Sequence, residues 1–275
     1  MALSFDGSTS HLSRSGGGLL TGYPFTIFLW TRARTTQTGF AVHVAIDPSA
    51  SGSSEGHGVI QSSSRMQACS TSSGTGGATA AYARRLVTTG DWVPCMVVFA
   101  SPSSRKVYYG TDAVQTGSTT VTQNPTILNV LSIGKQAVRS AYYWAGDLAC
   151  VGLWRTELSR TDYDTLVAGA VPSTVKTGSL VDYWSLLTQA ASQTGIYGGI
   201  LVANKTSQAS SHPIAESAGP PDNTAPTMSG SLTVSAISST GYTVTWPAGS
   251  DNVAVTSYEY SLDAGTTWTN VGNVL

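Results

Sequence analysis

Charged side chains are scarce in this sequence, and their scarcity excludes several classes of function. Lys, Arg, Asp and Glu together make up 11% of the residues, and 14 basic residues nearly balance 15 acidic ones, which gives a formal net charge of -1. Nucleic acids and anionic membranes attract proteins that carry a basic excess or a basic patch, so neither is an expected partner. Ser, Thr and Gly are abundant instead, which indicates a hydroxyl-rich surface of the kind that suits secreted and virion β-proteins.

Glutamate is especially rare, and this argues against hydrolysis of sugars. A glycosidase of the usual kind needs two carboxylates that face one groove. The glutamates are scattered, with no two close together: Glu55, Glu157, Glu216 and Glu259. The serines lack a G-x-S-x-G elbow, and no phosphate-binding loop is present. His43 lies inside an apolar strand, where we expect a hydrogen-bonded structural histidine. The sequence therefore predicts a protein that is not an enzyme.

Cysteines are few, and long apolar runs are missing. Cys69, Cys95 and Cys150 cannot all pair within one chain, and we expect them to be buried free thiols. None has C-x-x-C spacing, so no zinc site is expected. No apolar run approaches the length of a membrane span, so we expect no membrane insertion. The first residues lack the basic and apolar segments of a signal peptide, so we expect synthesis in the cytoplasm without a secretion signal.

Strand patterns dominate the first 205 residues, and one late segment breaks them. Residues 144–154 form an apolar strand, after which the period of the apolar residues changes to that of a helix. Ser159 stands at an N-cap position, Asp162 falls in the first turn and Gly169 follows as the stop. The sequence thus predicts a single short helix late in an otherwise all-β domain.

Several motifs, in this order, resemble the laminin G-like domains of the concanavalin A-like lectin and glucanase superfamily. They are the hairpin over 90–110, the NVLSIG strand over 129–134, the strand and helix over 144–169 and the VDYWSLL strand over 181–187. Together they cover about residues 3–205 in the order of the family. The resemblance implies an antiparallel jelly-roll sandwich over residues 1–205.

The composition and the strand pattern change after residue 205. Residues 206–226 are rich in Pro and Ser, which predicts a linker. Residues 227–275 resemble the first half of a fibronectin type III domain, with Trp246 at the position of that family's core tryptophan. An Ig-like sandwich needs about twice this length to close. We therefore expect a partial Ig-like sandwich, either shortened or completed by another chain.

Binding of glycan or protein is expected on loops, through exposed aromatic and amide side chains. The candidate ligand-binding residues lie before the closing strand and in the neighbouring loop: Tyr142, Tyr143, Trp144, Asn124, Gln136 and Arg139. The alternative for Trp144 is that it packs into the core at the start of the strand, with the two tyrosines on an edge.

Calcium is the metal that the resemblance would allow. Where the family has the acid pair of G-x-I-D-E-V, this chain has GDLACV, so both acids are replaced. Asp147 stands one position early, and Asp6 is the best remaining partner. We expect each aspartate to cap a turn instead, and we expect no metal and no other cofactor.

The pairing of these modules without a catalytic domain predicts a non-enzymatic structural or binding protein of a bacteriophage virion, such as a capsid decoration, tail or fibre component. Its expected partners are other virion proteins, further copies of itself and a host surface glycan. The alternative is a bacterial extracellular adhesin or carbohydrate-binding module, which would need a route of export. A glycoside hydrolase is the least favoured interpretation, because paired carboxylates are missing.

Overall fold

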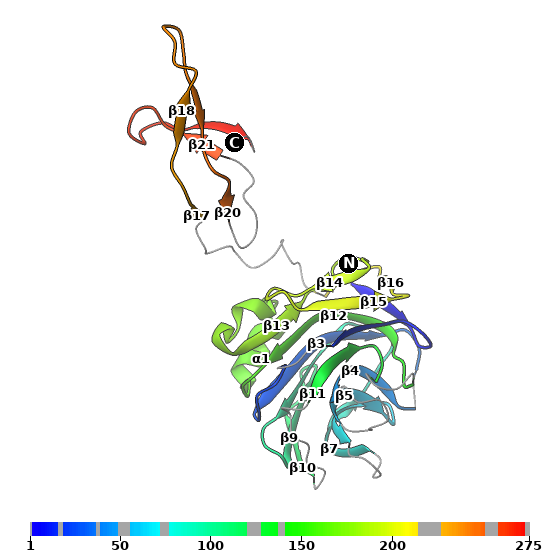
Figure 1. Ribbon diagram of the computed structural model, residues 1–275. Helices are drawn as coiled ribbons and strands as arrows, with labels where there is room; N and C mark the ends of the chain where they lie inside the picture. The colour runs from blue at the N-terminus through cyan, green and yellow to red at the C-terminus, as the bar shows by residue number, and fades with distance from the viewer. Residues whose placement is uncertain are drawn as a thin grey trace. The chain divides into compact units, whose positions relative to one another are not determined.

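The computed structural model describes residues 2–15, 19–36, 39–48, 56–71, 77–119, 128–136, 141–213, 227–250 and 258–272. The chain divides into two compact units, Met1–Ala218 and Gly219–Leu275, which are described one at a time (Figure 1). Within the described residues, no helix is long and apolar enough to cross a membrane.

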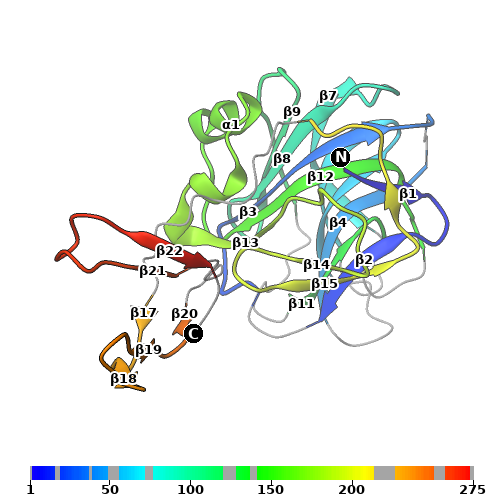
Figure 2. The ribbon, with the colours of Figure 1, turned by 90° about the horizontal axis from the view of Figure 1, so that it is seen from above.

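The first unit is a sandwich of two antiparallel sheets, as the jelly-roll prediction required (Figure 2). Sheet 1 has the strand order β10-β9-β8-β3-β12-β1-β16, and β13 pairs with β12. Its strands are β1 (Leu3–Asp6), β3 (Phe25–Ala33), β8 (Val93–Phe99), β9 (Ser104–Tyr109), β10 (Gln115–Ser118), β12 (Ala145–Trp154), β13 (Leu180–Trp184) and β16 (Ser207–Gln208).

Sheet 2 has the order β14-β15-β2-β11-β4-β5-β6-β7. Its strands are β2 (His11–Ser15), β4 (Ala41–Pro48), β5 (Gly56–Ser62), β6 (Arg65–Thr71), β7 (Gly77–Leu86), β11 (Leu128–Ile133), β14 (Ser192–Thr194) and β15 (Ile200–Asn204). Neighbouring strands in both sheets run antiparallel. The all-β fold class predicted from the sequence is confirmed.

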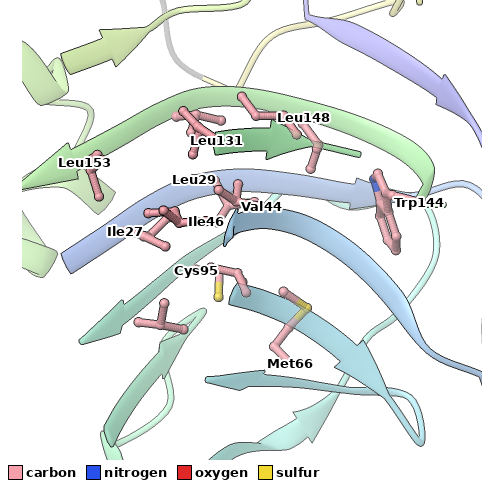
Figure 3. Packing of buried hydrophobic residues seen from close by; sticks show 14 of the residues in the cluster. Ile27, Leu29, Val44, Ile46, Met66, Cys95, Leu131, Trp144, Leu148 and Leu153 are labelled. Atoms are coloured by element: carbon pink, nitrogen blue, oxygen red, sulfur yellow. The ribbon is translucent and has the colours of Figure 1, made fainter. Parts of the chain in front are cut away.

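The main core lies between the two sheets. Alternate residues of β3, such as Ile27 and Leu29, face Val44 and Ile46 of β4, and all four are buried (Figure 3). Burial of apolar side chains on this scale is the main source of stability in a sandwich. All three cysteines are buried and free, which confirms that prediction.

Sheet 1 is covered on its other face too, which explains why its central strands β3, β8 and β12 are buried along nearly their whole length. Phe28 of β3 and Met96 of β8 belong to a second buried cluster, together with Tyr163 and Leu166 of helix α1 (Arg160–Val167). The helix begins as expected: Ser159 accepts a hydrogen bond from the Asp162 amide, and the Asp162 carboxylate accepts one from the Ser159 amide, which makes a capping box. Two short 3-10 helices, η2 (Pro172–Thr174) and η3 (Thr177–Ser179), follow before β13.

The segment after β15 remains part of this unit. Ser207 and Gln208 form β16, which pairs with Leu3 and Ser4 of β1. The Arg32 side chain then donates hydrogen bonds to the hydroxyls of Ser210 (3.2 Å) and Ser211 (2.8 Å). The first part of the predicted linker over 206–226 therefore packs on the sandwich.

The second unit contains three strand pairs in its described residues. They are β17 (Thr227–Met228) with β20 (Gly249–Ser250), β18 (Thr233–Ser235) with β19 (Thr243–Thr245), and β21 (Tyr258–Tyr260) with β22 (Thr269–Gly272). Large apolar side chains stay exposed here, among them Ile237 at 78% and Leu262 at 79%. This agrees with a sheet arrangement that lacks a covering layer. The fibronectin type III resemblance itself stays a prediction.

Candidate functional site

A surface cleft opens where the end strands of the two sheets lie side by side. Strand β7 ends sheet 2, strand β10 ends sheet 1, and the two strands pack against each other (Figure 1). The cleft has a volume of about 600 Å³, within the usual range for ligand sites. We call it the edge cleft, and its lining residues are Arg65, Ala81, Tyr82, Arg84, Gln115 and Thr116.

The alternation of β7 places two functional side chains in this cleft. Ala81 and Ala83 are buried against the core. Tyr82 and Arg84, which alternate with them along the strand, are exposed. A strand with period two thus separates its small core residues from its polar surface residues. Tyr82 is 57% exposed, so a large part of its ring is open to a ligand.

The two guanidinium groups are held by neutral acceptors. Arg84 donates from Nε to Oε1 of Gln115 at 3.0 Å. The amide nitrogen of Gln115 in turn donates to the carbonyl oxygens of Ala113 (2.8 Å) and Val114 (3.2 Å), which fixes the orientation of that amide. Arg65 donates from Nη1 to the carbonyl oxygens of Ala83 (3.0 Å) and Arg84. Both cations are therefore oriented before any ligand arrives.

Neither arginine is neutralised. The ion pairs between described residues involve other basic groups, from Arg14, Arg32, Arg34, Lys106 and Arg160. Among the described residues, no carboxylate lines the edge cleft. The two Nη groups of Arg84 have no hydrogen-bond acceptor among the described residues. The cleft thus combines an exposed aromatic ring with several free N–H donors and a net positive charge.

A buried polar network supports the strands that carry the cleft. Arg105 of β9 is fully buried and donates from Nε (3.1 Å) and Nη2 (2.7 Å) to the hydroxyl of Ser70 on β6. Because guanidinium only donates, the Ser70 hydroxyl gives its own proton to Nδ1 of His57 at 2.8 Å. His57 therefore carries its proton on Nε2, 2.8 Å from the Tyr23 hydroxyl. The network ties sheet 1 to sheet 2, and burial lowers the pKa of Arg105.

The loop that the sequence marked as a ligand site forms a different surface. Tyr142 is 44% exposed and lies beside Phe40, which is 45% exposed, with ring centroids 5.8 Å apart. Tyr143 is half-buried, and its ring lies 6.3 Å from that of His11. The two tyrosines are thus accessible aromatic groups on a loop, as expected. Phe40 was missed because its place at a strand start predicts a core residue.

Trp144 and Gln136 do not belong to that surface. Trp144 is fully buried among the core residues (Figure 3). Its ring centroid lies 3.9 Å from that of His43. It fills the core at the start of β12, so the ligand-binding role is wrong for this residue and the alternative of core packing is correct. Gln136 is 8% exposed and presents little of its amide. Asn124 and Arg139 lie outside the described residues.

The two weak metal candidates have other tasks. Asp6 caps a turn, because its Oδ1 accepts hydrogen bonds from the backbone amides of Ser8, Thr9 and Ser10. Burial opposes ionisation of Asp6, but these hydrogen bonds dominate and hold its pKa well below the usual value. Within the described residues, no group of three or more His, Cys, Asp or Glu side chains is arranged to hold a metal ion.

Asp147 is committed to two arginines rather than to a turn. Its Oδ2 accepts from Nε (2.8 Å) and Nη2 (2.7 Å) of Arg32, and Nε of Arg34 lies 3.8 Å from its Oδ1. The Ser4 hydroxyl also donates to Oδ1. Asp147 is 1% exposed, so it is a buried ion-pair partner, and the expectation that it caps a turn is wrong.

Comparison with solved structures finds likenesses at low sequence identity. A protein described as carbohydrate-binding from Bacteroides ovatus is 12% identical, with a TM-score of 0.48 over 78% of this chain and 62% of that one. The heptameric SAP-like pentraxin of Limulus polyphemus is also 12% identical, with a TM-score of 0.48 over 73% of this chain and 93% of that one. Domains LG4-5 of the mouse laminin alpha1 chain are 15% identical, with a TM-score of 0.35 over 54% of this chain and 41% of that one.

These likenesses concern the fold alone. The chain spans less than two thirds of the laminin and Bacteroides proteins that it matches. A search of the curated proteins found no match. The family comparison is decisive, because residues 6–162, more than half of the chain, match a laminin G-type family model. This match and the two-sheet sandwich agree, and the chain belongs to the concanavalin A-like lectin/glucanases superfamily.

Proposed function

We propose that this chain is a non-enzymatic saccharide-binding protein and that the edge cleft is its binding site. The observation that carries the proposal is the placement of an exposed ring, Tyr82, next to the oriented guanidinium of Arg84. Sugar rings stack their C–H faces on aromatic side chains, and their polar groups take hydrogen bonds from fixed donors. The superfamily name includes both lectins and glucanases. The cleft offers an aromatic ring and hydrogen-bond donors, which suit the binding of a sugar as in a lectin.

The glucanase alternative lacks support at this cleft. Hydrolysis by the usual route needs two carboxylates, about 5–10 Å apart, on either side of the scissile bond. The described residues that line the edge cleft include no carboxylate. The buried carboxylates Asp147 and Asp182 are each engaged by an arginine and by further hydrogen bonds. We therefore place binding, not bond cleavage, at this site.

The biological setting that we propose is a bacteriophage virion, in which the chain serves as a decoration, tail or fibre component. The support is the low charge of the chain and its hydroxyl-rich composition. Other virion proteins and further copies of the chain would be its partners, and a host surface glycan its ligand. An extracellular adhesin or carbohydrate-binding module of a bacterium is the alternative setting.

Two experiments test these proposals. A glycan array probed with the full chain tests binding, with a Tyr82→Ala variant as the matched control for the cleft. We expect the original chain to give signals on the array and Tyr82→Ala to lose them. An array on which the original chain gives no signal would contradict saccharide binding. Mass spectrometry of purified phage particles tests the setting. A defined copy number per particle is expected, and its absence from particles together with its presence on bacterial surfaces would favour the adhesin.

A further inference from the structure

We infer that the edge cleft selects an acidic saccharide, one that presents a carboxylate or a sulfate ester to Arg65 and Arg84. This inference rests on the proposed function and adds to it the chemical class of the ligand. It depends on three features of the cleft: the sign of its charge, the balance of its donors and acceptors, and its aromatic ring.

The charge of the cleft is uncompensated. Both arginines line it, no lining residue is acidic, and neither arginine has an ion-pair partner among the described residues. The chain as a whole has a formal net charge of -1, so this local excess is not a consequence of a basic protein. Like charges that line one cleft repel each other, and an anion bound between them offsets that repulsion. A ligand with a negative group removes that repulsion, and a neutral ligand does not.

The donors of the cleft outnumber its acceptors. Guanidinium has N–H groups only, and the Oε1 of Gln115, which can accept two hydrogen bonds, uses one of them for Arg84. The remaining side-chain acceptors are the hydroxyls of Tyr82 and Thr116. The hydroxyl of a neutral sugar can accept from these N–H groups, but each hydroxyl does so as a single uncharged acceptor. A carboxylate or sulfate brings only acceptors, which match the free N–H groups and allow bidentate contact with Arg84.

The aromatic ring argues that the anion is attached to a ring-shaped ligand. Tyr82 is 57% exposed on the same strand as Arg84, two residues away, so both side chains project from one face of β7. A free inorganic anion would use the arginines and leave the tyrosine without a role. A nucleic acid would require a wider basic surface than two arginines on a chain of net charge -1. An acidic sugar uses both groups at once.

Calorimetric titration of the full chain tests the inference with matched probes. The probes are a uronic-acid oligosaccharide, the same oligosaccharide with its carboxyl groups reduced to alcohols, a sulfated oligosaccharide of equal length, inorganic sulfate and a single-stranded oligonucleotide. We expect the acidic or the sulfated oligosaccharide to bind about tenfold or more tightly than the carboxyl-reduced one. The difference between the first and third probes identifies which anion the cleft prefers.

Variants test whether Arg84 causes the preference for the acidic probe. Arg84→Gln should weaken binding of the acidic probe about tenfold more than it weakens binding of the carboxyl-reduced probe, because only the acidic probe loses a charged partner. Arg84→Lys should fall between the original chain and Arg84→Gln, because it keeps the charge without the planar fork. Arg160→Gln is the matched control, since Arg160 is exposed on α1 and pairs with Asp164. It should bind like the original chain. Equal thermal unfolding of all three variants shows that Arg84 is not needed for folding.

The outcomes separate this inference from the proposed function. Equal affinity for the acidic and carboxyl-reduced probes would overturn the inference and leave saccharide binding intact. Binding of inorganic sulfate as tight as that of any saccharide, unchanged by Tyr82→Ala, would overturn both, because the cleft would then be a simple anion site. Tighter binding of the oligonucleotide than of every saccharide would overturn both as well.

Discussion

The imidazole of His43 lies against the indole of Trp144, with ring centroids 3.9 Å apart and an interplanar angle of 36°. Both side chains are fully buried. Their backbones are joined through Gly134, whose amide donates to the His43 carbonyl and whose carbonyl accepts from the Trp144 amide. The Val42 amide also donates to the Tyr142 carbonyl at 2.8 Å. This buried pair therefore fixes the end of the loop that presents Tyr142 to solvent.

The burial of His43 predicts a loss of stability in mild acid. Burial lowers the pKa of His43 from 6.5 to about 3. Below pH 6.5 the unfolded chain takes up a proton at this residue, and the folded chain does not until about pH 3. The contribution of His43 is therefore complete above pH 6.5 and is lost as the pH falls, at about 1.4 kcal/mol per pH unit.

Urea unfolding of the original chain and of a His43→Leu variant, each measured from pH 7.5 to 4, checks this prediction. The difference in unfolding free energy between the two chains should change with pH below 6.5, because the variant lacks the titrating group. The carboxylates contribute equally to both chains and cancel. A difference that stays constant over this range would show that His43 does not control acid sensitivity.

The hydrogen bonds of Ser70 predict a large effect of a small substitution. Ser70→Ala removes the hydroxyl that accepts from Nε and Nη2 of Arg105 and donates to His57; Nη2 keeps the Pro102 carbonyl, whereas Nε loses its acceptor among the described residues. Unpaired buried donors cost about 1–3 kcal/mol, so unfolding free energy should fall by at least that amount. Ser103→Ala, in the exposed turn beside Arg105, is the control and should change stability by less than about 0.5 kcal/mol. Equal effects of the two substitutions in urea unfolding would contradict the proposed role of the network.

The ion pair of Asp147 predicts a similarly large effect, for an electrostatic reason. Asp147→Asn leaves Arg32, whose side chain is 17% exposed, without its carboxylate. Breaking a buried pair on one side costs about 3 kcal/mol or more. Asp164→Asn also breaks an arginine pair, but its partners are about half exposed, and it should cost less than about 0.5 kcal/mol.

Limited proteolysis adds a structural readout for Asp147→Asn. Arg32 also holds the hydroxyls of Ser210 and Ser211, so a mispositioned guanidinium should release this segment from the sandwich. We expect faster cleavage near residues 207–213 in this variant than in Asp164→Asn. A variant that loses stability without faster cleavage there would show that Arg32 keeps its place through other contacts.

Local patterns were enough to predict the parts of the fold whose causes are local. The capping box of Ser159 and Asp162 lies within four residues, and the helix follows from it. The apolar strand predicted over 144–154 is β12, which is buried on both faces of its sheet. These features need no knowledge of which distant strands become neighbours.

The edge cleft could not be predicted in this way. Arg84 and Gln115 are 31 positions apart and meet only because β7 and β10, from different sheets, lie side by side. The same reason explains Trp144: its burial depends on a contact with His43, about a hundred positions earlier in the chain. A cluster of aromatic residues in the sequence does not indicate which ring faces the core.

Two exposed tyrosines allow the predicted loop site and the edge cleft to be compared directly. Tyr82→Ala removes the ring of the cleft, and Tyr142→Ala removes the most exposed ring of the loop, which lies beside Phe40. We expect Tyr82→Ala to weaken saccharide binding about tenfold, since loss of a stacking ring costs about 1–3 kcal/mol, and Tyr142→Ala to leave it unchanged. Both rings are about half exposed, so neither substitution should change unfolding by more than about 1 kcal/mol. Calorimetric titration with the tightest saccharide from the array decides between the sites, and a loss confined to Tyr142→Ala would move the binding site to the loop.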